Sequence, residues 1–197
     1  MNSFHPSHPY ILENKVVLLR PLTANDLAHL LPFAMREPEL WKYSLLSASG
    51  EDNMRNYLNK ALGERELGTS LPFIVWDKRT QKYAGSTRFY DIQENHETTQ
   101  LGYTWYGKDF QGTGLNKNCK YLLLQFAFDV MKVKRVEFRA DANNARSIAA
   151  MKSLGCVEEG ILRSNCNSPD GRRDSIILSI LQSEWQKDVK QQLKNKI

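Results

Sequence analysis

A glycine-bearing loop that follows a strand and opens an apolar helix is the feature that most constrains this chain. The loop reads Gln111-Gly112-Thr113-Gly114-Leu115-Asn116. The first N–H groups of a helix have no partner within the helix, and the helix dipole makes that end positive. Glycines let a ligand approach the backbone because they carry no Cβ. The segment therefore predicts a phosphate or pyrophosphate site, and a glycine-rich turn without a ligand is the alternative.

The surroundings of the loop narrow this interpretation. Lys117 and Lys120 add positive charge close to it. No Gly-Lys-Ser/Thr follows, and the three-glycine spacing of dinucleotide-binding folds is absent, so two common phosphate-binding patterns do not apply. The net charge is +5. The basic residues are scattered and not interleaved with aromatics, which does not favour nucleic acid as a partner.

The hydrophobic pattern predicts an α+β fold with a mixed central β-sheet flanked by helices. Residues 113–131 form the strongest predicted helix, because their apolar residues recur at helical spacing. An aromatic-rich strand at 101–106 precedes the loop, and an alternating strand at 134–140 follows the helix. The remaining predicted elements are strands at 16–20, 71–77, 83–91, 157–163 and 173–181, and helices at 23–35, 51–65, 144–154 and the C-terminus, with turns at 93–99 and 168–171.

The length of 197 residues predicts one domain. We place it at residues 15–190, between an N-terminal tail at 1–14 and a C-terminal tail at 191–197. No stretch approaches the ~20 apolar residues of a membrane helix, and the N-terminus lacks the apolar core of a secretory signal. A cytoplasmic location without membrane contact is therefore expected. The three cysteines include no C-x-x-C pair, so no metal site is predicted.

The loop resembles the acyl-CoA loop of the GNAT superfamily, Gln/Arg-x-x-Gly-x-Gly/Ala, in which Gln111 and Gly114 match. Asn116 departs from the small residue that the family prefers. A branch similar to the ribosomal-protein N-terminal (alanine/serine) acetyltransferases often carries Gly-Thr-Gly-x-Asn at this point. The resemblance extends over about residues 16–190, through Arg20-Pro21-Leu22, Gly85-Ser86-Thr87-Arg88, Gly102-Tyr103-Thr104-Trp105, Asn144-Ala145-Arg146-Ser147, Leu154-Gly155, Glu159-Gly160 and Asp170-Gly171-Arg172.

This resemblance implies an N-acetyltransferase with acetyl-CoA as acyl donor. The acceptor would be a primary amine, of a protein N-terminus or a small molecule, which attacks the thioester directly in a ternary complex. The family commonly dimerises, so the resemblance also allows a homodimer. Alternatives from the residues alone are core packing for the aromatic side chains and helix capping for Asn144 and Ser147. The implied acetyl-CoA contacts are Tyr103, Thr104, Trp105, Gln111, Gly112, Thr113, Gly114, Leu115, Asn116, Asn144 and Ser147.

Two positions where the family often places proton-transfer groups are altered in this chain. The tyrosine that many members carry seven residues after the asparagine is Met151, so Ser147 or a water is the substitute acid. The glutamate that many members carry as general base is Gln100, which cannot take a proton. Glu137 on the neighbouring strand is the candidate base, with a solvated or salt-bridged Glu137 as the alternative. Ser147 and Glu137 are thus the predicted catalytic residues. An acyl-CoA-binding regulatory module with little or no transferase activity is the competing function.

Overall fold

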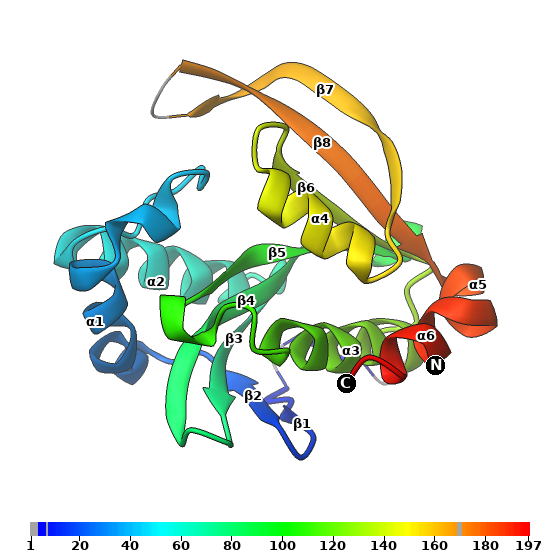
Figure 1. The fold of residues 1–197 in the computed structure, drawn as a ribbon, viewed down its shortest axis with the longest axis horizontal. Helices are drawn as coiled ribbons and strands as arrows, with labels where there is room; N and C mark the ends of the chain where they lie inside the picture. Colours follow the sequence, from blue (N-terminus) through cyan, green and yellow to red (C-terminus); the bar gives the residue numbers. More distant parts are fainter. Residues whose placement is uncertain (1–3, 7, 169–170) are drawn as a thin grey trace.

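Eight strands form one sheet in the computed structural model, which describes residues 4–6, 8–168 and 171–197 (Figure 1). The strand order is β1-β2-β3-β4-β5-β6-β8-β7, and all neighbours are antiparallel except β5 and β6. This arrangement confirms the predicted α+β fold with a mixed sheet. The strands are β1 (Leu12–Glu13), β2 (Val17–Pro21), β3 (Ser70–Asp77), β4 (Lys82–Gln93), β5 (Thr98–Tyr106), β6 (Arg135–Asp141), β7 (Val157–Ser168) and β8 (Gly171–Leu181).

Helices cover both faces of this sheet. Along β3, Phe73 and Val75 belong to the apolar cluster that contains α3, whereas Ile74 belongs to the cluster of α1 and α2. This alternation follows from the two-residue period of a strand. Among the described residues, no helix has the length and apolar character needed to cross a membrane. The helices are α1 (Leu27–Arg36), α2 (Glu51–Glu66), α3 (Leu115–Asp129), α4 (Ala145–Ser153), α5 (Gln182–Glu184) and α6 (Lys190–Lys194).

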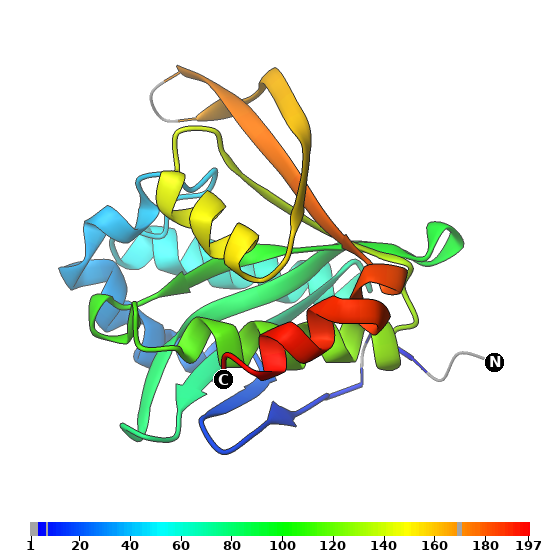
Figure 2. The same cartoon turned by 45° about the vertical axis from the view of Figure 1, so that its right-hand side comes forward.

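Several element boundaries differ from the prediction. Helix α3 begins at Leu115, because Gly114 precedes it in the left-handed region with φ +82°. Strand β7 continues to Ser168, so β7 and β8 form a longer hairpin than expected (Figures 1 and 2). The turn predicted to join these strands contains residues 169–170, which lie outside the described residues.

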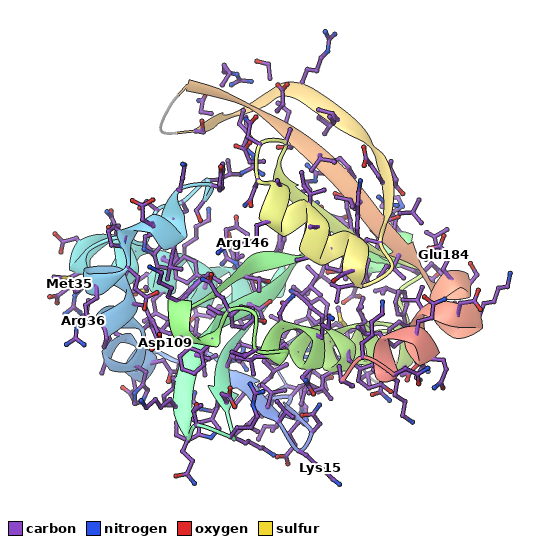
Figure 3. All side chains as sticks on the ribbon, viewed as in Figure 1. Lys15, Met35, Arg36, Asp109, Arg146 and Glu184 are labelled. Carbon is purple, nitrogen blue, oxygen red and sulfur yellow. The ribbon has the colours of Figure 1, made fainter. Side chains whose placement is uncertain are left out.

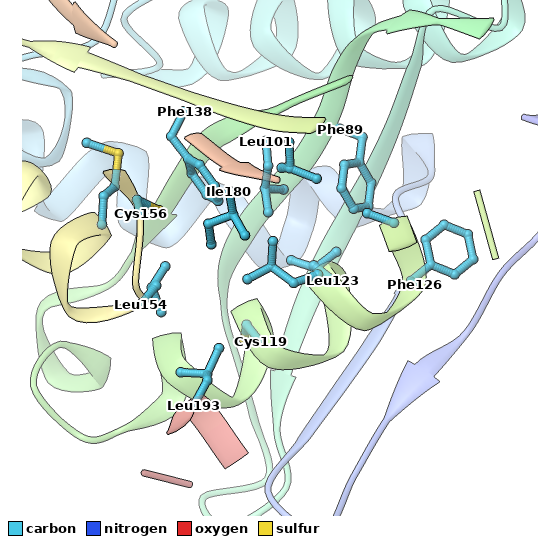
Figure 4. Close-up of a cluster of buried hydrophobic side chains, with 14 of the residues drawn as sticks. Phe89, Leu101, Cys119, Leu123, Phe126, Phe138, Leu154, Cys156, Ile180 and Leu193 are labelled. Atoms are coloured by element: carbon cyan, nitrogen blue, oxygen red, sulfur yellow. The ribbon is translucent and has the colours of Figure 1, made fainter. Parts of the chain in front are cut away.

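Helix α3, which follows the glycine loop, is anchored in the main apolar core. Leu115 and Leu123 of α3 are both fully buried. Figure 4 shows Leu123 and Phe126 packed among side chains from the strands and from Leu154 and Cys156, which follow α4. Burying a leucine side chain stabilises the fold by about 1.5–3 kcal/mol. The loop is therefore attached to a rigid element.

Some residues outside the predicted domain, which spans residues 15–190, also pack against the core. Strand β1 pairs with β2, and the Tyr10 ring lies 4.7 Å from the Phe126 ring of α3, measured between centroids. At the other end of the chain, Leu193 of α6 is only 1% exposed. Parts of both predicted tails therefore contact the core.

The sheet opens between its two parallel strands. β5 and β6 pair only where Thr98, Thr99 and Gln100 oppose residues 135–137. Beyond these three pairs β5 stays with β4, and β6 stays with β8, so the facing edges of β5 and β6 have no strand partner among the described residues. Figures 1 and 2 show β6 to β8 leaving the rest of the sheet as a separate arm. We call this opening the fork.

Candidate functional site

A cleft of about 1150 Å³ occupies the fork. Its walls come from β5, β6 and α4, from the glycine loop and the start of α3, and from the segment 39–46 that follows α1. Residues of the β7–β8 hairpin close another side. The cleft thus joins segments that lie more than a hundred residues apart in the chain.

The glycine loop leaves the start of α3 open. Gly112 and Gly114 have φ values of +74° and +82°, which other residues adopt only with strain. No side chain of the described residues caps the N-terminus of α3. Thr113 Oγ1 instead donates to Phe110 O at 2.8 Å, and Arg79 donates to Thr113 O at 3.0 Å, which fixes the loop from behind. Backbone N–H groups at this positive helix end are therefore available to an anion.

Gln111 connects the loop to the two walls of the cleft. Its Nε2 donates to the carbonyl of Tyr106 at the end of β5, at 2.8 Å. Its Oε1 accepts from Arg146 at the start of α4 (labelled in Figure 3). Gln111 thus holds the end of β5 and the start of α4 at a fixed separation.

Asn144 caps helix α4 at the edge of the cleft. Its Oδ1 accepts a hydrogen bond from the Ser147 N–H at 3.1 Å. This is the helix-capping contact predicted as the alternative to a ligand contact for Asn144. Asn144 and Ser147 both line the cleft, so capping and ligand contact are compatible.

Removing this cap has a measurable cost. Asn144→Ala should lower the free energy of unfolding by about 1 kcal/mol, because the side-chain acceptor for the first turn of α4 is lost. Asn144→Asp retains an acceptor oxygen and should recover most of that stability. Urea unfolding of the three proteins checks this expectation, and equal midpoints for the alanine variant and the parent would contradict it.

Tyr103, Thr104 and Trp105 all line the cleft. The Trp105 ring packs 4.8 Å from the Trp41 ring, and the Arg88 guanidinium lies 3.5 Å from the centre of the Tyr103 ring. The two aromatic side chains therefore serve packing, as in the alternative interpretation. Beyond Gln100, the backbone edge of β5 that faces β6 has no strand partner in the part of the chain that the structure describes.

The remaining loop residues divide into two groups. Gln111, Gly112, Gly114 and Asn116 line the cleft, whereas Thr113 and Leu115 do not. Leu115 is fully buried in the core, so its side chain is unavailable to a ligand. Its place at the start of α3 leaves only the backbone N–H as a contact.

The two predicted catalytic residues have different surroundings. Ser147 lines the cleft, but Glu137 does not. Arg135 and Arg139 contact the Glu137 carboxylate at 2.9 and 2.6 Å, so the salt-bridged alternative describes its surroundings. Each oxygen of the Glu137 carboxylate is thus in contact with an arginine.

A different carboxylate lies in the cleft beside Gln100. Gln100 Nε2 donates to Asp91 Oδ2 at 2.7 Å, and both residues line the cleft. Asp91 fixes the orientation of the amide, because only the NH₂ group can face a carboxylate. Gln100 Oε1 is buried and has no hydrogen-bond partner among the described residues. Asp91 has φ +50° at an irregular point of the β4–β5 pairing, a feature that no sequence signal marked.

Lys120 lies deeper than the sequence indicated. Its side chain is buried, and Nζ donates to Thr104 Oγ1 at 2.7 Å and to Thr87 Oγ1 at 3.3 Å. Burial lowers the pKa of Lys120 to about 8. The Lys120 ammonium therefore lies against β5 at the base of the fork, where it also adds positive charge to the cleft.

Comparison with known proteins identifies the family. The family described as "Acetyltransferase (GNAT) domain" matches residues 17–157. The chain therefore belongs to the GNAT family and is an N-acetyltransferase, and this family uses acetyl-CoA as acyl donor.

Relatives agree with this assignment over nearly the whole chain. A Bacillus subtilis (strain 168) protein named "Putative ribosomal N-acetyltransferase YdaF" is 26% identical over 171 residues, which cover 86% of this chain and 91% of the relative. The crystal structure of a "putative acetyltransferase" from T. thermophilus is 33% identical with a TM-score of 0.85, covering 96% and 98% of the two chains. Mycobacterium smegmatis RimJ in complex with CoA-disulfide has the same fold, with 20% identity and a TM-score of 0.80 over 98% and 97%.

Proposed function

We propose that this protein transfers the acetyl group of acetyl-CoA directly to a primary amine while both substrates are bound. One observation carries the proposal: the unpaired edges of β5 and β6 lead away from the uncapped N-terminus of α3 into a single cleft. A donor with phosphates at one end and an extended arm at the other matches that shape. The segment 39–46 and the β7–β8 hairpin enclose the cleft on other sides, where an acceptor would enter.

In this proposal, each part of the donor has a counterpart in the site. The pyrophosphate accepts hydrogen bonds from the backbone at Gly112, Gly114 and the first turn of α3. The pantetheine arm pairs with the free edge of β5, as a short extra strand. A backbone N–H of that edge polarises the thioester carbonyl. Asn144 and Ser147 contact the arm from the side of α4.

The acceptor that fits this site best is an amine of low pKa, at a peptide N-terminus or in an amino-acid-like molecule. An α-amino group has a pKa near 7.7–8.0 and lysine near 10.4, so roughly one α-amine in ten is neutral near pH 7, against about one lysine in a few thousand. Gln100 cannot act as a base, Glu137 is held by two arginines, and both oxygens of Asp91 already accept side-chain amides of Gln93 and Gln100. A site of this kind favours an amine that needs little help to lose its proton. The relative named as a putative ribosomal N-acetyltransferase supports a protein acceptor.

Matched peptides test this proposal. One peptide carries a free N-terminus with its lysine replaced by arginine, and the other carries a blocked N-terminus with its lysine free. We expect the first to release the CoA thiol at least tenfold faster at pH 7, because more of its amine is neutral. Thiol release is followed in a coupled colour assay, with a peptide lacking both amines as background. Faster release with the lysine peptide would rule out the low-pKa acceptor.

The competing function is an acyl-CoA-binding module that does not transfer. The amide at Gln100 and the thioether at Met151 favour it, because neither side chain exchanges a proton at neutral pH. This function predicts acetyl-CoA binding by calorimetry together with no thiol release across a panel of peptides and small amines. Thiol release above background with any member of the panel rules it out.

A further inference from the structure

The Lys120 ammonium lies at the base of the fork. Its side chain extends from α3 and is 4% exposed. Nζ is 2.7 Å from Thr104 Oγ1 on β5 and 6.0 Å from the ring centre of Phe138 on β6. Phe138 is the first β6 residue beyond the three pairs that join the strands. The ammonium thus touches β5 and faces β6 at the point where the two strands separate, and it lines the cleft.

No carboxylate among the described residues balances this ammonium. In the part of the chain that the structure describes, its hydrogen-bond partners are the hydroxyls of Thr87 and Thr104, and no carboxylate pairs with it. The titratable groups around it are Cys119 on α3 and Cys156 between α4 and β7, with Tyr106 of β5 against Cys119. Burial raises the pKa of both thiols to about 12 and the pKa of Tyr106 well above its ordinary value, so all three are neutral near pH 7. A buried cation without a counter-charge is costly, and such groups concentrate at functional sites.

We propose that Lys120 is the acid that protonates the departing CoA thiolate, the role that Met151 leaves vacant. This inference rests on the proposed transfer function. Met151 of α4 lines the same cleft, and its carbonyl accepts the N–H of Cys156, whose thiol is one of the groups near Lys120. Lys120 of α3 and Met151 of α4 therefore border the same region of the cleft. Of these two side chains, only Lys120 can donate a proton.

The proton and electron balance of the step is complete. The acceptor nitrogen bonds to the thioester carbon, and the C–S bond breaks with its electron pair moving to sulfur. The sulfur takes a proton from Lys120 Nζ and leaves as the CoA thiol, while the attacking nitrogen loses its own proton to solvent. The neutral lysine then regains a proton from water. The pKa of Lys120, about 8, lies close to that of a thiol near 8.5, so little driving force is lost in this transfer.

The acid is active in its charged form, which fixes the sign of the pH dependence. The turnover number should fall as the pH rises through about 8, because the ammonium is lost there. Lys120→Met should reduce turnover by about 10²-fold or more and abolish this fall. Lys120→Arg keeps the charge but has a pKa far above the working range, so it should be slow without a fall near pH 8.

A titration of bound CoA tests the lysine without any acceptor. The ultraviolet absorbance of the thiolate gives the thiol pKa of CoA bound to each protein. We expect that pKa to lie at least one unit lower in the parent and in Lys120→Arg than in Lys120→Met, because the cation stabilises the thiolate. Lys194→Met, an exposed lysine of α6, is the matched control and should resemble the parent. Thermal melting confirms that each variant is folded. If Lys120→Met is not folded, the loss of the fall in turnover near pH 8 in Lys120→Arg carries the test.

The outcomes separate the two proposals. Equal thiol pKa values in the parent and Lys120→Met, with only weaker CoA binding in the variant, would overturn the role of Lys120 and leave it a donor-binding residue. A turnover profile in Lys120→Met that still falls near pH 8 would also overturn it. Failure of the parent to acetylate any amine, with the shifted thiol pKa intact, would instead overturn the proposed function and confirm the contact between Lys120 and the sulfur.

Discussion

Gly114→Ala is expected to weaken acetyl-CoA binding by roughly 5- to 30-fold while leaving the protein folded. Gly114 has φ +82°, and a Cβ there would meet no atom within 4 Å, so the protein itself has room for a methyl group. The left-handed conformation costs an alanine about 1–2 kcal/mol. We expect the alanine loop to leave this conformation when no donor is bound, so that the cost falls on binding, where 1.4 kcal/mol is a factor of ten. The new methyl group also borders the cleft.

Gly63→Ala is the matched control for this variant. Gly63 lies within α2, has no positive φ, and likewise has nothing within 4 Å of a built Cβ. The same change there should stabilise the protein by about 0.5–1 kcal/mol and leave the donor affinity unchanged. Isothermal calorimetry with acetyl-CoA compares the two variants. An unchanged dissociation constant for Gly114→Ala would show that the loop does not need its left-handed residue to hold the donor.

Gly85→Ala is expected to have the largest effect on folding, a loss of at least about 3 kcal/mol. A Cβ at Gly85 would lie 2.0 Å from the Trp105 carbonyl oxygen and 2.9 Å from the Tyr106 Cα. Both atoms belong to the backbone of β5, so the clash is relieved only if β4 and β5 separate. Small domains have about 5–15 kcal/mol of stability in total. The variant should therefore melt far below the parent or fail to fold.

The same contact connects stability to the site. Separation of β4 from β5 at this point would shift the backbone of Thr104 and Trp105, which border the cleft. Denaturant unfolding followed by tryptophan fluorescence measures the effect, with Gly63→Ala again as control. A Gly85→Ala variant with the midpoint of the parent would show that β5 adjusts locally and that the close approach is not required.

Much of the geometry of the candidate donor site could be predicted because it depends on local sequence. Two glycines before an apolar helix need only their neighbours to form an open helix N-terminus, and the structure has Gly112, Gly114 and α3 in that arrangement. The mixed sheet could likewise be predicted from strand and helix periods. Asn144 could be placed at the start of a helix because its residue type favours that position.

The proposed proton-transfer region could not be predicted, because it depends on how distant strands meet. The sequence indicates Lys120 only as a positive charge near the loop. The contacts of its ammonium with Thr87 and Thr104 form only when the strands that carry these threonines pack against α3. Asp91 and Gln100 meet through an irregular pairing of β4 with β5 that the sequence does not mark. Neither contact follows from spacing along the chain.

The three residue pairs between β5 and β6 have a consequence for the molecule as a whole. They are the backbone junction between a five-stranded half and a three-stranded half of the sheet, so without donor the arm of β6, β8 and β7 is held mainly by side chains. A pantetheine arm bound along the fork would bridge the edges of β5 and β6 beyond these three pairs. Bound donor would then contribute to the structure of the sheet itself. The two halves of the sheet would be connected most firmly in the complex that forms just before the reaction.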